Sequence, residues 1–242
     1  MLSIFRRKPI RFWSTYPGVV DCHPIIPAHR LERAYGKCPH AAKQKHASKC
    51  PALKQLGSTG WIVPMPCDVK IITNGDMETV DWKAPTLLDT DNGFVSVHDG
   101  TQSAASAPPH SMNSVIKIGT TWRVSAPKDV VFIQSPVLYN GEKRFTSALG
   151  IFDPRRVPQL NAQLYWHVLE GETLIEAGTP MMQLIPMMRE SLRSFDYFVE
   201  DASHEDYVFE EKLNYNMSSK FDIETPTVMK NNQKIIENHY GN

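Results

Sequence analysis

Short strand-like segments, separated by proline, glycine or polar turns, run along the chain and are densest between residues 122 and 186. They occupy residues 61–73, 77–82, 94–98, 115–118, 121–125, 130–134, 148–152, 160–169 and 181–186. Several strands at short, regular spacing are typical of an all-β sandwich, jelly roll or barrel. Strands do not alternate with helical segments, which argues against a doubly wound sheet. We therefore expect a mainly β fold, a jelly-roll-like or β-clip-like sandwich.

Pattern and composition divide the chain into three regions. Residues 1–57 form an irregular N-terminal arm that prolines interrupt, with short helices expected at 28–35 and 41–56. Residues 58–190 hold the strands and form the expected β-sandwich domain. Residues 191–242 form a C-terminal extension that is first acidic and aromatic and then polar, and its polar end is typical of a disordered segment.

The composition excludes some classes of partner. The chain has 242 residues, 41% of them hydrophobic, which suffices for one sizeable core. Lys plus Arg and Asp plus Glu both number 26, so the net charge is zero. This balance argues against a protein that mainly holds nucleic acid or an anionic membrane. The sequence shows neither the apolar region of a signal peptide nor an apolar run of the roughly 18–20 residues that span a membrane. We expect a soluble protein made in the cytosol, with no nucleic-acid or membrane partner.

One group of cysteines and histidines has the residue types of a metal site. His46 and Cys50 are four residues apart and would share one face of a helix, and Cys38 with His40 could complete a tetrahedral zinc site. The usual C-x2-C and H-x3-H spacings are missing, and neighbouring lysines oppose a divalent cation. The alternative is a basic helix with buried thiols.

A second candidate lies at the end of the segment 94–98. His98 is followed by Asp99 and then by Gln102. A histidine, a carboxylate and a distant histidine (His110 or His167) could form the facial triad of an iron oxygenase. However, His98 and Asp99 are adjacent, so in a continuous strand their side chains point to opposite faces. The alternative is that His98 and Gln102 hydrogen-bond a loop or a ligand.

A third candidate follows the apolar segment 148–152. Asp153 precedes Arg155 and Arg156, and the two arginines could bind a carboxylate or a phosphate in a bidentate manner. The alternative is a solvated turn. Trp122 is added to these arginines as a candidate for ligand binding. Asp153, with His98 and Gln102, is a candidate for catalysis, but no nucleophile elbow or phosphate-binding loop accompanies them in the sequence.

Several loose motifs occur in a fixed order over residues 10–190. They are Ile10-Arg11-Phe12-Trp13-Ser14-Thr15-Tyr16-Pro17-Gly18, Pro24-Ile25-Ile26-Pro27-Ala28, Lys49-Cys50-Pro51, Gly60-Trp61-Ile62-Val63-Pro64-Met65-Pro66-Cys67-Asp68, His98 with Gln102, Trp122 with Pro127, Gly150-Ile151-Phe152-Asp153, and Gly178-Thr179-Pro180 through Gln183-Leu184-Ile185-Pro186. In this order they resemble a family of uncharacterised proteins encoded by tailed phages of marine bacteria, of the cyanophage type. The resemblance implies a phage protein of the host cytoplasm or the virion, and it implies no activity.

A fainter resemblance concerns the second half of the chain. Gly150-Ile151-Phe152-Asp153 followed by Gly178-Thr179-Pro180-Met181-Met182-Gln183-Leu184-Ile185 is similar in order to the motifs of dUTPase-like jelly-roll proteins. Two departures are clear, because Pro154-Arg155-Arg156 stands where an Asp-Tyr-Arg-Gly motif is expected, and Gln134-Ser135-Pro136 replaces an Arg-Ser-Ser phosphate loop. No glycine-rich C-terminal motif follows. The resemblance therefore implies a fold and argues against dUTP hydrolysis.

These observations lead to one functional prediction with two alternatives. We predict a phage-encoded, non-enzymatic protein that is virion-associated or binds other proteins, with protein partners or self-assembly and with no cofactor. The first alternative is a cupin-like metal-dependent oxygenase that uses His98 and would hold iron. The second alternative is an interaction module that holds zinc between Cys38 and Cys50.

Overall fold

The computed structural model describes residues 9–16, 18–33, 37, 39, 47–85, 93–103, 107–193, 199–217 and 226–240. The chain forms two compact units. The first combines Met1–Ala34 with Ser58–Arg193, and the second combines Tyr35–Gly57 with Ser194–Asn242.

The first unit consists mostly of strands. Its elements are β1 (Arg11–Ser14), α1 (Val19–Cys22), β2 (Ile26–Pro27), η1 (Ala28–Arg30), β3 (Trp61–Pro64), β4 (Val69–Asn74), β5 (Val80–Lys83), β6 (Val95–His98), α3 (Gly100–Ser103), β7 (Val115–Ser125), β8 (Val130–Pro136), β9 (Phe145–Ser147), β10 (Gly150–Phe152), β11 (Gln159–Trp166), β12 (Glu170–Ile175), β13 (Pro180–Met188) and η5 (Arg189–Leu192). The helix predicted over 28–35 is wrong in length, because Leu31 adopts an extended backbone directly after the single turn η1.

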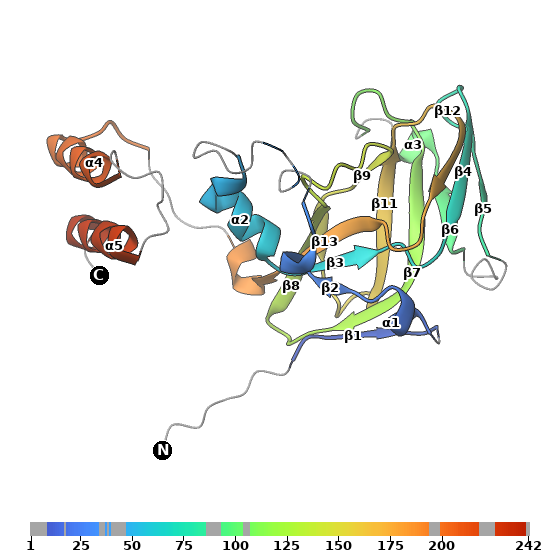
Figure 1. Ribbon diagram of the computed structural model, residues 1–242, viewed down its shortest axis with the longest axis horizontal. Coiled ribbons are helices and arrows are strands. Elements are labelled where there is room, and N and C mark those ends of the chain that lie inside the picture. Colours follow the sequence, from blue (N-terminus) through green and yellow to red (C-terminus); the bar gives the residue numbers. More distant parts are fainter. Residues whose placement is uncertain are drawn as a thin grey trace, which may run out of the picture. The chain divides into compact units, whose positions relative to one another are not determined.

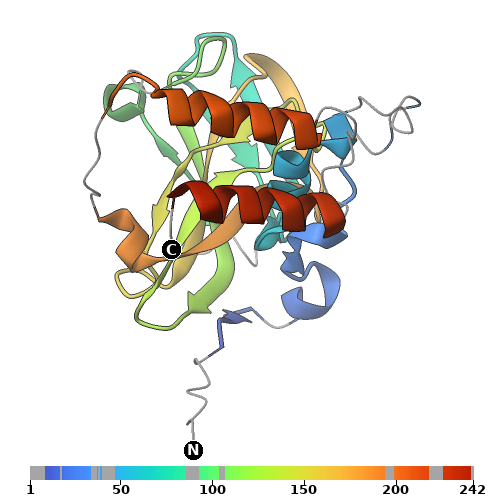
Figure 2. The same ribbon diagram turned by 90° about the vertical axis from the view of Figure 1, so that its left-hand side faces the viewer.

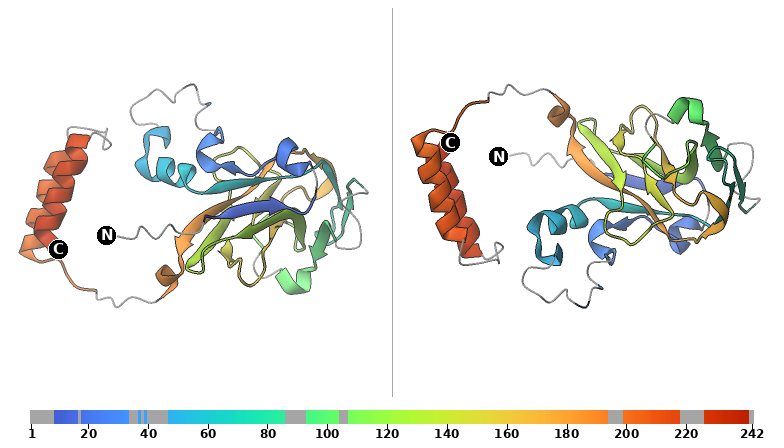
Figure 3. Two further views of the ribbon diagram at one scale, coloured as in Figure 1. Left: turned by 90° about the horizontal axis from the view of Figure 1, so that it is seen from below. Right: turned by 90° about the horizontal axis from the view of Figure 1, so that it is seen from above.

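The strands form antiparallel sheets that pack into a sandwich (Figures 1 and 3). One five-stranded sheet has the order β1-β7-β11-β9, with β6 also paired to β7, and the other has the order β10-β8-β13-β3-β2. A three-stranded sheet, β12-β4-β5, completes the unit. One buried cluster joins side chains of all three sheets, among them Ile116, Phe132 and Ile71. The predicted mainly β, jelly-roll-like sandwich is confirmed.

Strand β11 shows how the sequence directs one face of a sheet into the core. Leu160, Ala162, Leu164 and Trp166 are fully buried, whereas the polar residues between them are only partly buried. This alternation follows from the two-residue period of a strand. Burying each large apolar side chain contributes roughly 1.5–3 kcal/mol relative to its exposure. The same alternation places a row of polar side chains on the other face of β11.

The chain changes from one sheet to the other between β9 and β10. β9 pairs with residues 164–166 of β11, and β10, which begins after Ala148 and Leu149, pairs with β8. β10 is therefore an edge strand, and residues 159–162 of β11 have β7 on one side and none of the described strands on the other. The sandwich is open along this edge.

The N-terminal segment is part of the sandwich and is anchored by a buried arginine. β1 pairs with β7, and β2 pairs with β3. Arg33 is 7% exposed and donates hydrogen bonds to the carbonyl oxygen of Leu138 (2.8 Å) and to Oε1 of Gln183 (3.2 Å). Gln183 in turn donates from Nε2 to the carbonyl oxygen of Thr59 (2.7 Å).

The second unit is helical in its described part. It contains η3 (Ala47–Lys49), α2 (Pro51–Ser58, whose last residue falls in the first unit), α4 (His204–Met217) and α5 (Pro226–Tyr240). Figure 2 shows α4 and α5 side by side. They run antiparallel, because the start of α4 (His204) and the end of α5 (Asn238) line one hollow. No described helix has the length and apolar character needed to cross a membrane.

The polar C-terminal end has a composition typical of a disordered segment, but α5 occupies most of it. Local signals explain both helices. Before α4, Ser203 Oγ accepts a hydrogen bond from Asp206 N (3.2 Å), and Asp206 Oδ2 accepts one from Ser203 N (2.8 Å). This reciprocal arrangement is a capping box. Helix α5 begins at Pro226, and proline is favoured at the first helical position.

Candidate functional site

A groove of about 270 Å³ lies at the open edge of the sandwich, between β10 and the first part of β11. Four carboxamide side chains line it, and we call it the amide groove; they are Gln134, Gln159, Asn161 and Gln163. Gln134 Nε2 donates a hydrogen bond to Gln163 Oε1 (3.3 Å), which links the two sheets. Because carboxamides both donate and accept hydrogen bonds, the groove suits neutral polar groups such as peptide units.

Apolar side chains accompany these carboxamides. Leu149, Ile151 and Val157 line the amide groove and expose 72%, 53% and 52% of their surface. By contrast, Phe132 of β8 and Leu160 and Leu164 of β11 point into the core and are buried. A group of exposed apolar residues around a polar hollow is typical of an interaction site.

The backbone of β11 also faces the groove. Ala148 N donates to the carbonyl oxygen of Gln163 (2.8 Å), so the backbone groups of Gln163 are directed away from β7. Alternate residues of a strand direct their N–H and C=O groups to the same side, so those of Asn161 face the open edge as well. In addition, the Oδ1 atom of Asn161 is buried without a hydrogen-bond partner among the described residues. Such an acceptor costs about 1–3 kcal/mol until a donor satisfies it.

The turn between β10 and β11 carries three of the residues predicted for a site. Asp153 Oδ1 lies 2.9 Å from Arg189 Nη2 and 3.6 Å from Arg155 Nε, and Asp153 Oδ2 lies 3.9 Å from Arg156 Nε. The side chain of Asp153 is 11% exposed, whereas those of Arg155 and Arg156 are 51% and 86% exposed. The adjacent Arg189 guanidinium lowers the pKa of Asp153 to about 2; partial burial opposes this, and the Arg155 backbone N–H and charge assist it. We call these four residues the arginine turn.

The arginine turn is continuous with the amide groove. Phe152 directly precedes it, Val157 directly follows it, and both line the groove. Arg189 directly follows β13 as the first residue of η5, and its backbone N–H donates to the carbonyl oxygen of Asp129 (2.7 Å). The site therefore combines a neutral groove with a cationic end.

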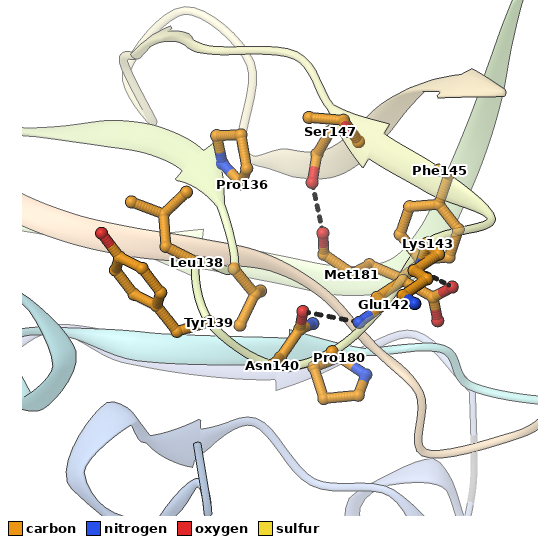
Figure 4. Close-up of a pocket in the computed structure, with 13 residues that line it drawn as sticks. Pro136, Leu138, Tyr139, Asn140, Glu142, Lys143, Phe145, Ser147, Pro180 and Met181 are labelled. Atoms are coloured by element: carbon orange, nitrogen blue, oxygen red, sulfur yellow. Dashed lines mark hydrogen bonds between the residues drawn. The ribbon is translucent and has the colours of Figure 1, made fainter. Parts of the chain in front are cut away.

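A second hollow, of about 320 Å³, lies under the loop that follows β8 (Figure 4). Residues 136–143 line it together with β9 and with the start of β13. Ser147 Oγ donates to the carbonyl oxygen of Met181, and Asn140 Oδ1 accepts from the backbone N–H of Glu142 (3.0 Å). The Ser147 hydroxyl is therefore hydrogen-bonded to a backbone carbonyl. Activation of a serine nucleophile would instead require a hydrogen bond to a basic side chain.

An ion pair holds the loop around this hollow. Glu142 Oε2 lies 2.7 Å from Arg144 Nη2, and Glu142 Oε1 accepts hydrogen bonds from the backbone N–H groups of Lys143 and Arg144. Burial alone would raise the pKa of Glu142, but the bonds to Arg144 outweigh it and lower that pKa, and the pKa of Arg144 is raised. Tyr139 has a φ of 60°, which is uncommon outside glycine. These interactions shape the loop, so we assign the hollow a structural role.

The predicted oxygenase residues lie at the end of the edge strand β6 and in the turn after it. His98 ends β6 and pairs with Val115 of β7. Asp99 Oδ1 accepts hydrogen bonds from the backbone N–H (2.9 Å) and the hydroxyl group of Thr101, so it caps helix α3, in which Gln102 lies. Within the described part of the chain, no three His, Cys, Asp or Glu side chains are grouped to hold a metal ion.

Most of the predicted zinc ligands, namely Cys38, His40 and His46, lie outside the described residues. Cys50 is partly buried at the start of α2, where its carbonyl oxygen accepts a hydrogen bond from Lys54 N (3.1 Å). The zinc site stays a prediction.

Trp122, predicted to bind a ligand, is 3% exposed and belongs to the central core cluster. A ligand in solvent therefore has no access to it. Sequence reasoning missed the carboxamides of β11 and the exposed apolar residues near β10. The alternation Gln159-x-Asn161-x-Gln163 is present in the sequence. These side chains line a groove only because the chain leaves β11 after β9 and continues as β10 in the other sheet, which the sequence does not reveal.

No protein-family model and no curated protein matches this chain. Among solved structures, the chain is similar to a mutant dUTPase from phage phi11 of S. aureus, with 8% identity and a TM-score of 0.38 over 82% of this chain and 99% of that chain. That protein belongs to the class of the fainter sequence resemblance.

Proposed function

We propose that this protein is a phage-encoded, non-enzymatic binding module that takes up an extended segment of a partner protein in the amide groove. The observation that carries the proposal is the pair of open strand edges, β10 and residues 159–162 of β11, that line one groove. An extended peptide satisfies such edges through backbone hydrogen bonds. The phage origin rests on the ordered motifs over residues 10–190.

The side chains around the groove support a peptide as the occupant. Proteins that keep an edge strand unpaired commonly protect it with lysine, proline or a covering loop. The chain here instead places Leu149 and Ile151 at the edge, both largely exposed. Alternate side chains of an added strand would contact these apolar residues, while its peptide groups would meet the carboxamides.

A differential selection from a random twelve-residue peptide display library tests the proposal. The whole chain is immobilised, and a Leu149→Lys/Ile151→Lys variant serves as the comparison, because both side chains are exposed and their replacement leaves the core intact. We expect peptides rich in β-branched residues to be enriched on the natural protein and lost on the variant. Equal enrichment on both proteins, or enrichment on neither, would overturn the proposal.

A matched control replaces exposed apolar residues elsewhere in the same unit. Val20→Lys/Leu174→Lys adds the same charge at side chains that are 52% and 43% exposed and lie outside the groove. This control should retain the selected peptides. A dimer of the natural protein that Leu149→Lys/Ile151→Lys abolishes, seen by light scattering, would identify the occupant as a second copy and contradict a separate partner.

Elemental analysis of protein purified without chelators tests the two rival functions. Our proposal predicts a folded protein without stoichiometric metal. Stoichiometric iron that His98→Ala releases would favour the oxygenase, and stoichiometric zinc that Cys50→Ser releases would favour the zinc module.

A further inference from the structure

We infer that the arginine turn is a carboxylate-binding subsite, so that the amide groove prefers a peptide with an aspartate or glutamate at the end that lies beside Phe152. This inference rests on the proposed function and names the chemistry of the partner. The inference assigns a peptide carboxylate as the ligand of Arg155 and Arg156. The sequence did not reveal that these two residues lie beside the groove.

The charge balance of the arginine turn leaves two guanidinium groups available. Arg189 lies closest to Asp153, at 2.9 Å, and thereby compensates its single carboxylate. Arg155 and Arg156 lie 3.6 and 3.9 Å from the same carboxylate, beyond a normal hydrogen bond. Three cations and one anion give this cluster a net charge of +2. The planar fork of an arginine matches a carboxylate in two parallel hydrogen bonds.

The position of the cluster selects the ligand. Phe152 and Val157 flank the turn and line the groove, so a strand that pairs with β10 must end or pass beside Arg155 and Arg156. The ring of Phe152 is fixed against Phe132, with centroids 6.2 Å apart, which holds the start of the turn on the core. Because the groove itself is lined by neutral carboxamides and apolar residues, the cationic charge is confined to one end. An acidic residue at one end of the peptide is the complement of this pattern.

The test repeats the selection from the same peptide library on an Arg155→Gln/Arg156→Gln variant. Both side chains are more than half exposed, so the variant should fold normally. We expect peptides from the natural protein to share an acidic residue at one end, and peptides from the variant to lack it while keeping the apolar, β-branched pattern. The best acidic peptide and its Asp→Asn or Glu→Gln derivative are then compared by fluorescence anisotropy. We expect about tenfold weaker binding of the derivative to the natural protein, as for one partly screened charge-assisted pair, and equal binding to the variant.

A charge-matched control separates this subsite from a general effect of net charge. Arg30→Gln/Arg193→Gln also removes two exposed cations, and neither residue belongs to the arginine turn. This control should keep the acidic preference and the tenfold difference. Selected peptides without a positional acidic residue, or an equal loss in both double variants, would overturn the subsite while leaving the peptide-binding role in place. Failure of the Leu149→Lys/Ile151→Lys comparison would remove the role itself.

Discussion

Arg189, which directly follows β13, places its Nη2 atom 2.9 Å from Oδ1 of Asp153, which directly follows β10. Neither strand pairs with the other, because β8 lies between them. The ion pair therefore spans β8 and fastens the edge strand β10 to the centre of its sheet. β10 has a backbone hydrogen-bonding partner on one side only, so this ion pair helps to hold Asp153 and the arginine turn in place.

The first prediction concerns the pH dependence of this pair. Arg189 lowers the pKa of Asp153 to about 2, below an unfolded value of about 3.9. A carboxylate with a lowered pKa stabilises the fold above its unfolded pKa, and this contribution is lost as pH falls from about 4 to about 2. Arg189→Gln should therefore lower the free energy of unfolding by about 1 kcal/mol at pH 6 and by less at pH 3.

Urea unfolding at both pH values and an NMR titration of the Asp153 carboxyl group measure this effect. In Arg189→Gln the titration should move upward, towards the ordinary range. The control is Arg193→Gln, because Arg193 follows Arg189 in the chain but pairs only loosely with Glu190, at 4.0 Å between two side chains that are 80% exposed. A pH-independent loss in Arg189→Gln would contradict the assignment.

The second prediction uses two glycines with nearly the same backbone conformation. Gly60 and Gly18 have φ values of 79° and 83°. A Cβ atom at Gly60 would lie 1.9 Å from the carbonyl oxygen of Leu184, whereas a Cβ atom at Gly18 would meet nothing within 4 Å. Gly18→Ala should therefore lower the free energy of unfolding by about 1 kcal/mol, the cost of placing alanine in the left-handed conformation. Gly60→Ala should lower it by at least about 3 kcal/mol, because β3 must also move away from β13 to make room for the Cβ atom. Chemical denaturation of both variants measures the difference, and equal costs would show that the backbone conformation alone decides.

The sequence predicted the sandwich because its strands carry their own signals. The alternation of β11, with Leu160 and Leu164 inside and carboxamides between them, is readable without any structure. The turn after β4 was equally readable, since Asn74-Gly75-Asp76 is followed by β5. Local patterns of period two and of turn residues are sufficient for such elements.

The groove was not readable, because it depends on pairing between distant strands. In the sequence, Leu149 and Ile151 resemble core residues. They are exposed because the chain pairs with β11 through β9 and then with β8 through β10. Trp122 is the opposite case, because the sequence suggested it as a ligand-binding residue and the structure buries it in the core. Arg155 and Arg156 are exposed, and their binding of a ligand stays a prediction. The contact of Asp153 with Arg189 could not be inferred from the spacing in the sequence.

The third prediction concerns the buried arginine that anchors the N-terminal segment. Arg33→Ala removes the donors to the carbonyl oxygen of Leu138 and to Oε1 of Gln183. Each is a hydrogen bond from a charged group, and a buried acceptor left without a partner costs about 1–3 kcal/mol. We expect a loss of about 3 kcal/mol in the free energy of unfolding, measured by urea denaturation. Arg30→Ala, at an exposed position three residues earlier, is the control and should change stability by less than about 0.5 kcal/mol.

The last prediction separates two cysteines by their environment. Burial, assisted by the charge of Asp68, raises the pKa of Cys67 to about 12, whereas Cys22 is an exposed free thiol. Only the thiolate reacts with iodoacetamide, and at pH 8 a thiol with that pKa is ionised in about one molecule in ten thousand. Peptide mapping by mass spectrometry after a short treatment at pH 8 should therefore find Cys22 alkylated and Cys67 unmodified. The same treatment in urea should modify both, which shows that the fold protects Cys67. Rapid modification of Cys67 in the native protein would mean that the loop after β3 opens, and would contradict the packing of Cys67 against the core.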